Sequence, residues 1–250
     1  MKMMNNNLVQ ILKQSKNIVF FGGAGVSTES GIPDFRSEEG IYNQKTNNSY
    51  SPEEIVSHYF FKRRPKDFYS FYKAKLVHLE AKPNDCHRAL VTLEKMGKLS
   101  AIITQNIDGL HQAAGSKNVI ELHGSVYENY CIKCHKKYDI SYILNAKDIP
   151  FCSCGKLIRP DIVLYGETLD ENVIKQAIEA ISSADTLIIG GTSLIVYPAA
   201  TLVNYFHGKT IVLINKTVTP ADEKANLIIH DPIAKVMNSA VTLLLKSTEI

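Results

Sequence analysis

The chain has 250 residues, of which 45% are hydrophobic and 21% charged, so it can bury a sizeable core in one domain or in one large and one small domain. Its formal net charge of +3 is too small to indicate a nucleic-acid or membrane partner, and we expect neither. The chain shows no signal-peptide pattern and no apolar run that could span a bilayer, so we expect a cytoplasmic protein whose five cysteines stay reduced.

The first elements are predicted to be a helix followed by a buried strand. Hydrophobic residues recur at helical spacing over 8–12, and an apolar run follows at 18–21. This strand leads into a segment rich in small residues, 22–36. Small residues allow backbone N–H groups to approach a phosphate, which predicts a nucleotide pocket.

The segment after the first strand matches the dinucleotide-binding fingerprint only in part. Gly23 and Gly25 fit its first two glycines, but Thr28 stands at the third, and no acid ends a second strand about 20 residues later. The loop is therefore expected to bind a dinucleotide without making the chain a dehydrogenase. Next, Asp34-Phe35-Arg36 places an acid, a ring and a cation side by side, which indicates a ligand contact, although a tight turn fixed by Pro33 explains these residues equally well.

The following region, 40–83, is predicted to be a helical insertion. Ser51-Pro52-Glu53-Glu54 has the pattern of a capping box and begins a helix. An aromatic-rich helix is expected over 66–79.

The remainder of the chain alternates strand and helix patterns. Strands are expected at 101–103, 186–189, 210–214 and 227–229, and helices at 84–96, 171–182 and 197–206. This alternation predicts an α/β fold with a doubly wound parallel sheet.

Polar side chains follow the strand at 101–103. Residues Gln105 to Asp108 would lie at the carboxyl edge of the sheet, where ligands bind in open α/β folds, although a purely structural loop could carry them too. His123 ends a later apolar stretch. A lone histidine is more often a satisfied core residue, but its place between the polar strand end and a cysteine-rich segment favours a catalytic base in a cleft.

Four of the five cysteines lie in two close pairs within 125–160, which is typical of a structural zinc site with no open coordination position. The predicted ligands are Cys131, Cys134, Cys152 and Cys154. A single residue separates the second pair, and Gly155 would permit this tighter turn. His135 is a possible substitute ligand, whereas Cys86 lies alone on a helix and is expected in the core.

The second half of the predicted pocket follows the strand at 186–189. Gly191-Thr192-Ser193 repeats the pattern of a strand followed by small residues. Asn215 ends the next strand, where nucleotide-binding folds usually contact ribose hydroxyls, although such an amide can also cap a turn. Ile233 is expected near the adenine.

These motifs together resemble the sirtuin family of NAD-dependent protein deacylases, bacterial type. The resemblance rests on Gly23–Ser27, Gly31–Arg36, Thr104–His111 and His123-Gly124, and the cysteine pairs and the motifs at 163–167 and 191–194 extend it from about residue 18 to the C-terminal strand. It implies a Rossmann-like NAD-binding domain (1–39, 84–124 and 161–250), a helical insertion (40–83) and a zinc-ribbon module (125–160).

The resemblance also implies an activity and its residues. The enzyme would be an NAD-dependent protein-lysine deacetylase, acting on acetyl-lysine proteins and releasing nicotinamide and O-acetyl-ADP-ribose, with His123 as general base and Asn106 as a second catalytic residue. The implied cofactor-binding residues are Ala24, Gly25, Ser27, Thr28, Asp34, Phe35, Arg36, Gln105, Asn106, Ile107, Asp108, His123, Gly191, Thr192, Ser193, Asn215, Lys216 and Ile233. The substrate backbone would pair with Val163, Leu164, Tyr165, Leu194 and Val196 as an added β-strand.

Two departures from the family pattern bear on the substrate. Tyr165 replaces the phenylalanine that is common before Gly-Glu, and no arginine follows Tyr69 by three residues. Relatives that prefer succinyl or malonyl groups bind the acid with such a Tyr-x-x-Arg pair, so neutral acyl groups, acetyl first, are expected.

Mono-ADP-ribosyl transfer to protein is the alternative activity, because it needs the same cleavage of NAD. A zinc-ribbon module that binds nucleic acid or modified protein would have no use for the polar strand end at Gln105 to Asp108. A dehydrogenase is disfavoured by the incomplete dinucleotide fingerprint.

Overall fold

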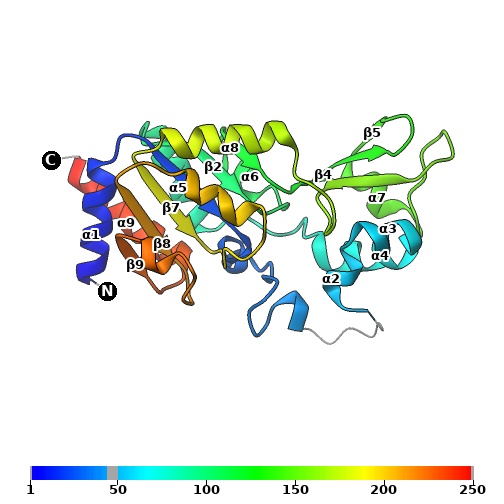
Figure 1. The fold of residues 1–250 in the computed structure, drawn as a ribbon, viewed down its shortest axis with the longest axis horizontal. Coiled ribbons are helices and arrows are strands. Elements are labelled where there is room, and N and C mark those ends of the chain that lie inside the picture. Colours follow the sequence, from blue (N-terminus) through cyan, green and yellow to red (C-terminus); the bar gives the residue numbers. More distant parts are fainter. Residues whose placement is uncertain (1, 44–49, 249–250) are drawn as a thin grey trace.

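A six-stranded, all-parallel sheet forms the larger part of the molecule (Figure 1). The computed structural model describes the chain except residues 1, 44–49 and 249–250. The strands are β1 (Ile18–Gly22), β2 (Leu99–Thr104), β3 (Val119–Glu121), β7 (Thr186–Gly190), β8 (Thr210–Ile214) and β9 (Leu227–Ile229). Their order, β3-β2-β1-β7-β8-β9, is that of a Rossmann fold and confirms the predicted fold class.

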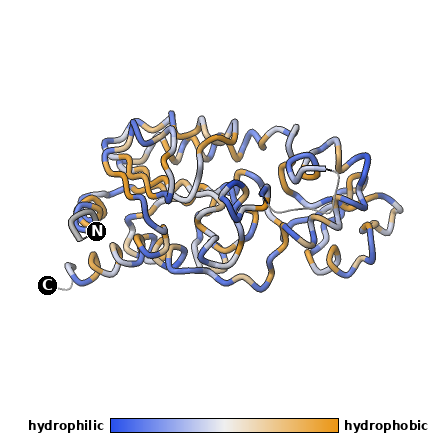
Figure 2. The backbone as a smooth tube through the Cα atoms, turned by 90° about the horizontal axis from the view of Figure 1, so that it is seen from below, coloured by the Kyte–Doolittle hydropathy of each residue, from blue (hydrophilic) through white to orange (hydrophobic). Residues whose placement is uncertain are grey.

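Successive side chains of the central strands enter two separate cores. Ile18 and Phe20 pack on one face of the sheet with α1 (Lys2–Gln14), α5 (Asp85–Lys95) and α9 (Ile233–Thr248). Val19 and Phe21 pack on the other face with α8 (Glu171–Ser183) and a 3-10 helix, η5 (Ala199–Tyr205). Because both faces are covered, the strands are hydrophobic throughout, which Figure 2 shows as orange stretches along the chain.

The elements predicted in this domain were found with small differences. The segment expected to be a helix at 197–206 is a 3-10 helix that begins after Pro198. A short helix, α6 (Leu110–Ala114), follows the polar end of β2, and 3-10 turns η1 (Ala24–Val26) and η2 (Thr28–Ser30) follow β1. A last 3-10 turn, η6 (Asp222–Lys224), lies between β8 and β9. Within the described ranges, no helix has the length and apolar character needed to cross a bilayer.

The helical insertion contains more elements than the sequence predicted. After η3 (Ile41–Asn43), the capping box at Ser51 begins α2 (Pro52–Ile55), with Glu54 N–H donating to Ser51 Oγ (3.2 Å). Helix α3 (His58–Arg63) was not predicted. The aromatic helix begins at Pro65 as α4 (Pro65–Phe71) and ends in a π-helical turn, Tyr72–Leu76.

The cysteine-rich segment forms a three-stranded antiparallel sheet of order β5-β4-β6. Its elements are β4 (Gly124–Cys131), β5 (Lys137–Tyr138), α7 (Ile140–Asn145) and β6 (Ile158–Ile162). Little apolar core was expected here, but Ile143 and Ile158 are fully buried in a cluster shared with Phe61 and Tyr69 of the insertion. The insertion and the cysteine-rich segment are therefore packed together, on the side of the molecule away from the large sheet (Figure 1).

Candidate functional site

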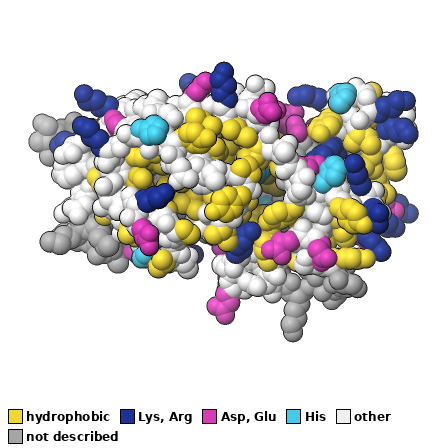
Figure 3. Space-filling view, viewed as in Figure 1, with side chains coloured by type: hydrophobic (Ala, Val, Ile, Leu, Met, Phe, Trp, Pro, Cys, Tyr) yellow, Lys and Arg dark blue, Asp and Glu magenta, His cyan; other side chains and the backbone are white. Residues whose placement is uncertain are grey.

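A cavity of about 510 Å³ lies between the carboxyl edge of the large sheet and the segment after β6. Figure 3 shows this region as a hollow between the two parts of the molecule, bordered by hydrophobic side chains (yellow). All of the predicted cofactor-binding residues line it, and so do four of the five predicted substrate residues. Its volume is that of a small-molecule or cofactor site.

The loops after β1 and β7 contact each other through their backbones at the base of the cavity. Gly25 N–H donates to the carbonyl of Gly191 (2.8 Å), and a Cβ on Gly25 would lie 2.8 Å from both Cα and O of Gly191. Gly191 itself has a φ of +59°. The sequence analysis attributed these glycines to the close approach of a phosphate. In the structure they are needed for another reason as well, because the two loops are in backbone contact and leave no room for a side chain.

A buried hydrogen-bond chain joins the first loop to the polar end of β2. Ser27 Oγ donates to Asp108 Oδ2 (2.6 Å) and accepts from Asn106 Nδ2 (3.1 Å). Burial raises the pKa of Asp108, although hydrogen bonds from Ser27 and from Leu110 N–H lower it in part. The Ser27 hydroxyl donates its proton to Asp108 and so orients the acid, while the contact of Ser27 with the cofactor stays a prediction.

His123 is held in a defined tautomer at the cavity wall. Its Nδ1 lies 2.9 Å from the carbonyl oxygen of Gln105, which can only accept, so Nδ1 carries the proton and Nε2 is left with a lone pair. Burial lowers the pKa of the His123 imidazole, and the bond to Gln105 only partly offsets this. The side chain is therefore a neutral base, as general-base chemistry on a hydroxyl requires.

Gln105 itself connects the two halves of the sheet. Its Nε2 donates to Thr192 Oγ1 (2.9 Å), and its backbone N–H donates to the carbonyl of Gly22 (3.0 Å). The residue that fixes the His123 tautomer is thus tied to both loops at the base of the cavity.

The far end of the cavity is formed by the ends of β8 and β9. Asn215 and Lys216 line it directly after β8, and the Asn215 amide donates to the carbonyl of Thr217 (3.0 Å), which leaves its Oδ1 available to a ligand hydroxyl. A Cβ on Gly190 would overlap with Ile233, so this glycine makes room for the side chain predicted to contact adenine.

The predicted substrate edge, 163–165, has almost all of its backbone groups engaged within the protein. Val163 N–H donates to the carbonyl of His123 and Tyr165 N–H to that of Val56 (both 3.0 Å), while Leu164 N–H donates to Glu167 Oε2 (2.9 Å). Among the described residues, no donor is found for the carbonyl of Val163. This edge can therefore accept from a peptide at Val163 but cannot donate to it from residues 163–165.

Leu194 does not line the cavity as expected. Its side chain is only 7% exposed and packs in the core on the α8 side of the sheet, and its N–H donates to Thr192 Oγ1 (3.3 Å). The reason is its backbone, since a φ of +52° turns the chain away from an extended strand at this point. Val196 does line the cavity.

Glu167 fixes the turn that follows the substrate edge. Its carboxylate accepts two hydrogen bonds from the Arg159 guanidinium (2.7 and 3.0 Å), one from Leu164 N–H, and contacts His58 Nδ1 (2.6 Å). Burial raises the pKa of Glu167, but these partners outweigh it and lower the pKa from 4.5 to about 2. The carboxylate therefore stays charged and holds the edge against the helical insertion.

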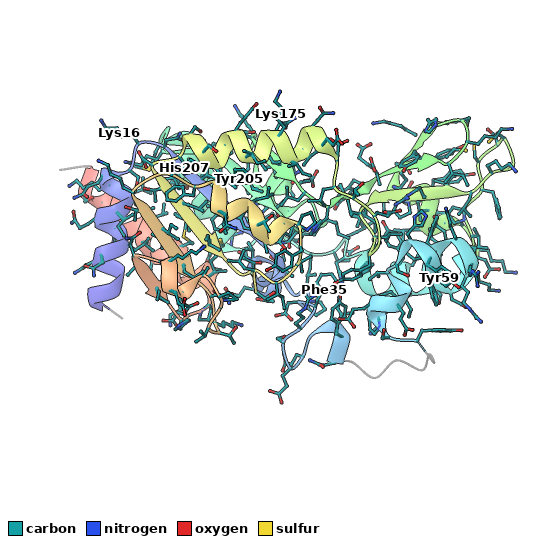
Figure 4. All side chains as sticks on the ribbon, in the orientation of Figure 1. Lys16, Phe35, Tyr59, Lys175, Tyr205 and His207 are labelled. Carbon is teal, nitrogen blue, oxygen red and sulfur yellow. The ribbon has the colours of Figure 1, made fainter. Side chains whose placement is uncertain are left out.

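The segment 34–42 covers the cavity from the side of the insertion. Tyr42 OH lies 2.8 Å from Tyr165 OH, and Arg36 Nη2 donates to the same Tyr165 oxygen (3.2 Å). Phe35 packs against the Tyr42 ring with centroids 5.4 Å apart, and Figure 4 places Phe35 between the large sheet and the insertion. Neither Tyr42 nor its contact with Tyr165 was predicted.

The four predicted metal ligands come together at one point. The sulfur atoms of Cys131, Cys134, Cys152 and Cys154 all lie within 4.8 Å of one another, and the pairs 131–154 and 134–152 are 3.4 and 3.5 Å apart. A tetrahedral zinc site with bonds of about 2.3 Å needs sulfurs roughly 3.8 Å apart, so the cluster fits zinc. His135 is not part of the group; its ring stacks on Tyr130. Cys86 is buried in the core, as expected.

Several cavity residues were missed by the sequence analysis. Ile32 and Pro33 lie within the motif Gly31–Arg36, so the predicted cofactor residues next to them pointed to their position in the cavity wall. Lys75 and His78 gave no signal, because Lys75 lies in the π-helical turn and His78 comes just after it, and the exposed face of such a turn could not be read from spacing.

Comparisons with known proteins agree on one family. The model of the Sir2 family matches residues 23–198. The chain is 63% identical to a protein of Clostridium perfringens named NAD-dependent protein deacetylase, over 94% of this chain and 98% of that one, and 58% identical to its namesake in Clostridium tetani, over 94% and 96%.

Solved structures give the same result. One described as a Sir2 variant with a deacetylated p53 peptide and 3′-O-acetyl ADP-ribose superposes with a TM-score of 0.88 at 40% identity, covering 95% of this chain and 97% of that one. Another, a Sir2 homologue in complex with NAD, gives 0.87 at 36% identity, covering 97% and 94%.

Proposed function

The chain belongs to the Sir2 family and is an NAD-dependent protein deacetylase, and from the geometry of its cavity we propose which residues carry each step. Its substrates are acetyl-lysine proteins. A neighbouring structure that contains both a deacetylated peptide and acetylated ADP-ribose supports transfer of the acetyl group to ADP-ribose over transfer of ADP-ribose to a protein.

The residues of the two contacting loops and of the β2 end fit NAD. When bound, NAD supplies the ribose carbon to which the acyl oxygen is transferred, with nicotinamide as the leaving group. Asn215 and Ile233 would contact the adenosine half at the far end of the cavity, and Ala24 and Thr28 the diphosphate. Asp108, oriented by Ser27, would hold the carboxamide of nicotinamide together with Ile107, which keeps the reacting bond in one geometry.

His123 is the general base. His123 lines the cavity, and its unprotonated Nε2 would accept a proton from a ribose hydroxyl as that hydroxyl attacks the acyl carbon. The observation that carries this proposal is the hydrogen bond from His123 Nδ1 to the carbonyl of Gln105, because it fixes the tautomer of a neutral imidazole in the cavity wall and leaves Nε2 unprotonated. Asn106, bonded to Ser27, would help orient the ribose.

The four cysteines would hold zinc in a structural role, since four sulfur ligands leave no position for a substrate. The zinc would tie β4 and the 152–154 turn together and so support the sheet whose β6 leads into the substrate edge. Thiolate ligands need a reducing compartment, which supports a cytoplasmic location.

The function is tested by product analysis. The protein is incubated with NAD and an acetyl-lysine peptide, and products are identified by mass spectrometry. We expect nicotinamide, O-acetyl-ADP-ribose and peptide lighter by one acetyl group, in equal amounts. A peptide that gains ADP-ribose and keeps its acetyl group would contradict the assignment.

A further inference from the structure

The Tyr165 hydroxyl connects the substrate edge to the segment 34–42 by hydrogen bonds. Its oxygen accepts from Arg36 Nη2 (3.2 Å), which leaves its own proton free for the oxygen of Tyr42 (2.8 Å). Burial and this contact with Tyr165 both raise the pKa of Tyr42, so the Tyr42 hydroxyl keeps its proton. One hydroxyl group thus contacts two residues that lie more than a hundred positions earlier in the chain.

The backbone of Tyr165 is fixed independently of that hydroxyl. Its N–H donates to the carbonyl of Val56 (3.0 Å), and its carbonyl accepts from His58 N–H (2.9 Å). The following Glu167 is held by Arg159. Removing the hydroxyl would therefore leave the substrate edge in place.

The segment 34–42 is tied together as one unit. Asp34 Oδ1 accepts from the N–H groups of Arg36 (3.2 Å) and Ser37 (2.8 Å), and the Asp34 carbonyl accepts from Ile41 N–H (2.8 Å). The Tyr42 N–H donates to the carbonyl of Phe35 (2.9 Å). Because Phe35 and Tyr42 are joined by this bond and by ring contact, whatever fixes Tyr42 also fixes Phe35.

We propose that the Tyr165 hydroxyl is a positioning group for NAD binding: it anchors the segment 34–42 to the substrate edge, so that Phe35 and Arg36 are held over the cofactor end of the cavity. This rests on the proposed function, and Phe35 and Arg36 are taken as the NAD-binding residues that the sequence resemblance implies. The substrate edge thereby acts on both ligands, on the peptide through its backbone and on NAD through one side-chain oxygen.

The test compares Tyr165→Phe, Tyr42→Phe and the double variant with the wild-type enzyme. Deacetylation of an acetyl-lysine peptide is measured with NAD and peptide varied in turn, and ADP-ribose binding is measured by calorimetry. Tyr165→Phe keeps the ring and loses two hydrogen bonds, so we expect the KM for NAD and the Kd for ADP-ribose to rise about two- to ten-fold. The rise in the KM for NAD should exceed any change in the KM for peptide. The double variant should be no weaker than Tyr165→Phe alone, because both changes break the same contact.

Tyr142→Phe is the matched control. Tyr142 is 43% exposed against 40% for Tyr165, and its hydroxyl also makes one exposed bond, to the carbonyl of Phe151 (2.8 Å), far from the cavity. It should leave the KM for NAD unchanged. An unchanged KM for NAD in Tyr165→Phe, a rise confined to the peptide, or additive losses in the double variant would each overturn the proposal. A failure of the proposed function would differ, since the wild-type enzyme would then not deacetylate the peptide at all.

Discussion

Replacing Glu167 by glutamine would remove a charge from the turn that follows the substrate edge while keeping the shape of the side chain. The carboxylate is 16% exposed and the Arg159 side chain that it binds is 14% exposed. Lowering the pKa of the Glu167 carboxyl from 4.5 to about 2 corresponds to about 3 kcal/mol of stabilisation at neutral pH. Water still reaches the edge of the pair, so we expect Glu167→Gln to lower the free energy of unfolding by about 2 kcal/mol at pH 7.

The difference in the free energy of unfolding between the wild-type protein and Glu167→Gln should depend on pH. Because the pKa of Glu167 is lowered in the folded state, its stabilisation is complete above pH 4.5 and is lost as the pH falls towards 2. The wild-type protein and the variant should therefore converge in stability at acidic pH. Loss of zinc at low pH affects both proteins alike and cancels in their difference.

Urea unfolding followed by far-UV circular dichroism measures the difference, since the chain has no tryptophan for fluorescence. Glu128→Gln is the control, because the Glu128–Lys137 pair is exposed (56% and 82%) and its loss should cost under about 0.5 kcal/mol. A Glu167→Gln variant as stable as Glu128→Gln at pH 7, or a loss of the same size at pH 3, would refute the reasoning.

Three further predictions follow from the site. His123→Ala should reduce deacetylation by about 100-fold or more while ADP-ribose still binds in calorimetry, and undiminished turnover would remove His123 from the mechanism. In the wild-type enzyme, the acid limb of the pH profile of kcat/KM should lie below pH 6.5, because burial lowers the pKa of His123. Cys154→Ser, or a zinc chelator, should release zinc, lower the melting temperature and abolish peptide turnover, whereas the core residue change Cys86→Ala should leave zinc stoichiometry at one. Gly25→Ala should weaken ADP-ribose binding about ten-fold or more, because its Cβ would meet the Gly191 backbone at 2.8 Å; unchanged affinity would show that the two loops can separate.

Five of the six strands of the large sheet were predictable because they are buried on both faces, whereas β3 and the C-terminal helix α9 were not predicted. Ile18 to Phe21 is apolar at every position, since alternate side chains enter two different cores. After β2, the polar residues from Gln105 onwards mark the point at which the chain is no longer buried between these cores. The cysteine cluster was predictable for a different reason, since ligand spacing is visible in the sequence.

What could not be predicted depends on contacts between distant segments. Leu194 follows a strand and a run of small residues, which is the pattern of a ligand-binding loop. Its side chain nevertheless packs in the core, because the backbone has a positive φ at this position. The bond of Tyr42 to Tyr165 joins residues 123 positions apart. The shared core of the insertion and the cysteine-rich segment is likewise invisible to periodicity, because the pattern within one segment does not show which other segment its apolar residues contact.

The order of the strands has a consequence for the newly made chain. Strand β1 is synthesised before both of its partners: it lies in the middle of the sheet and pairs with β2 and with β7, which ends at Gly190. Similarly, the core around Phe61 is incomplete until β6 has been synthesised. During synthesis, then, one edge of β1 stays unpaired until β7 has emerged, and the aromatic side chains around Phe61 stay exposed until β6 has emerged, so we expect chaperones to bind these segments before then.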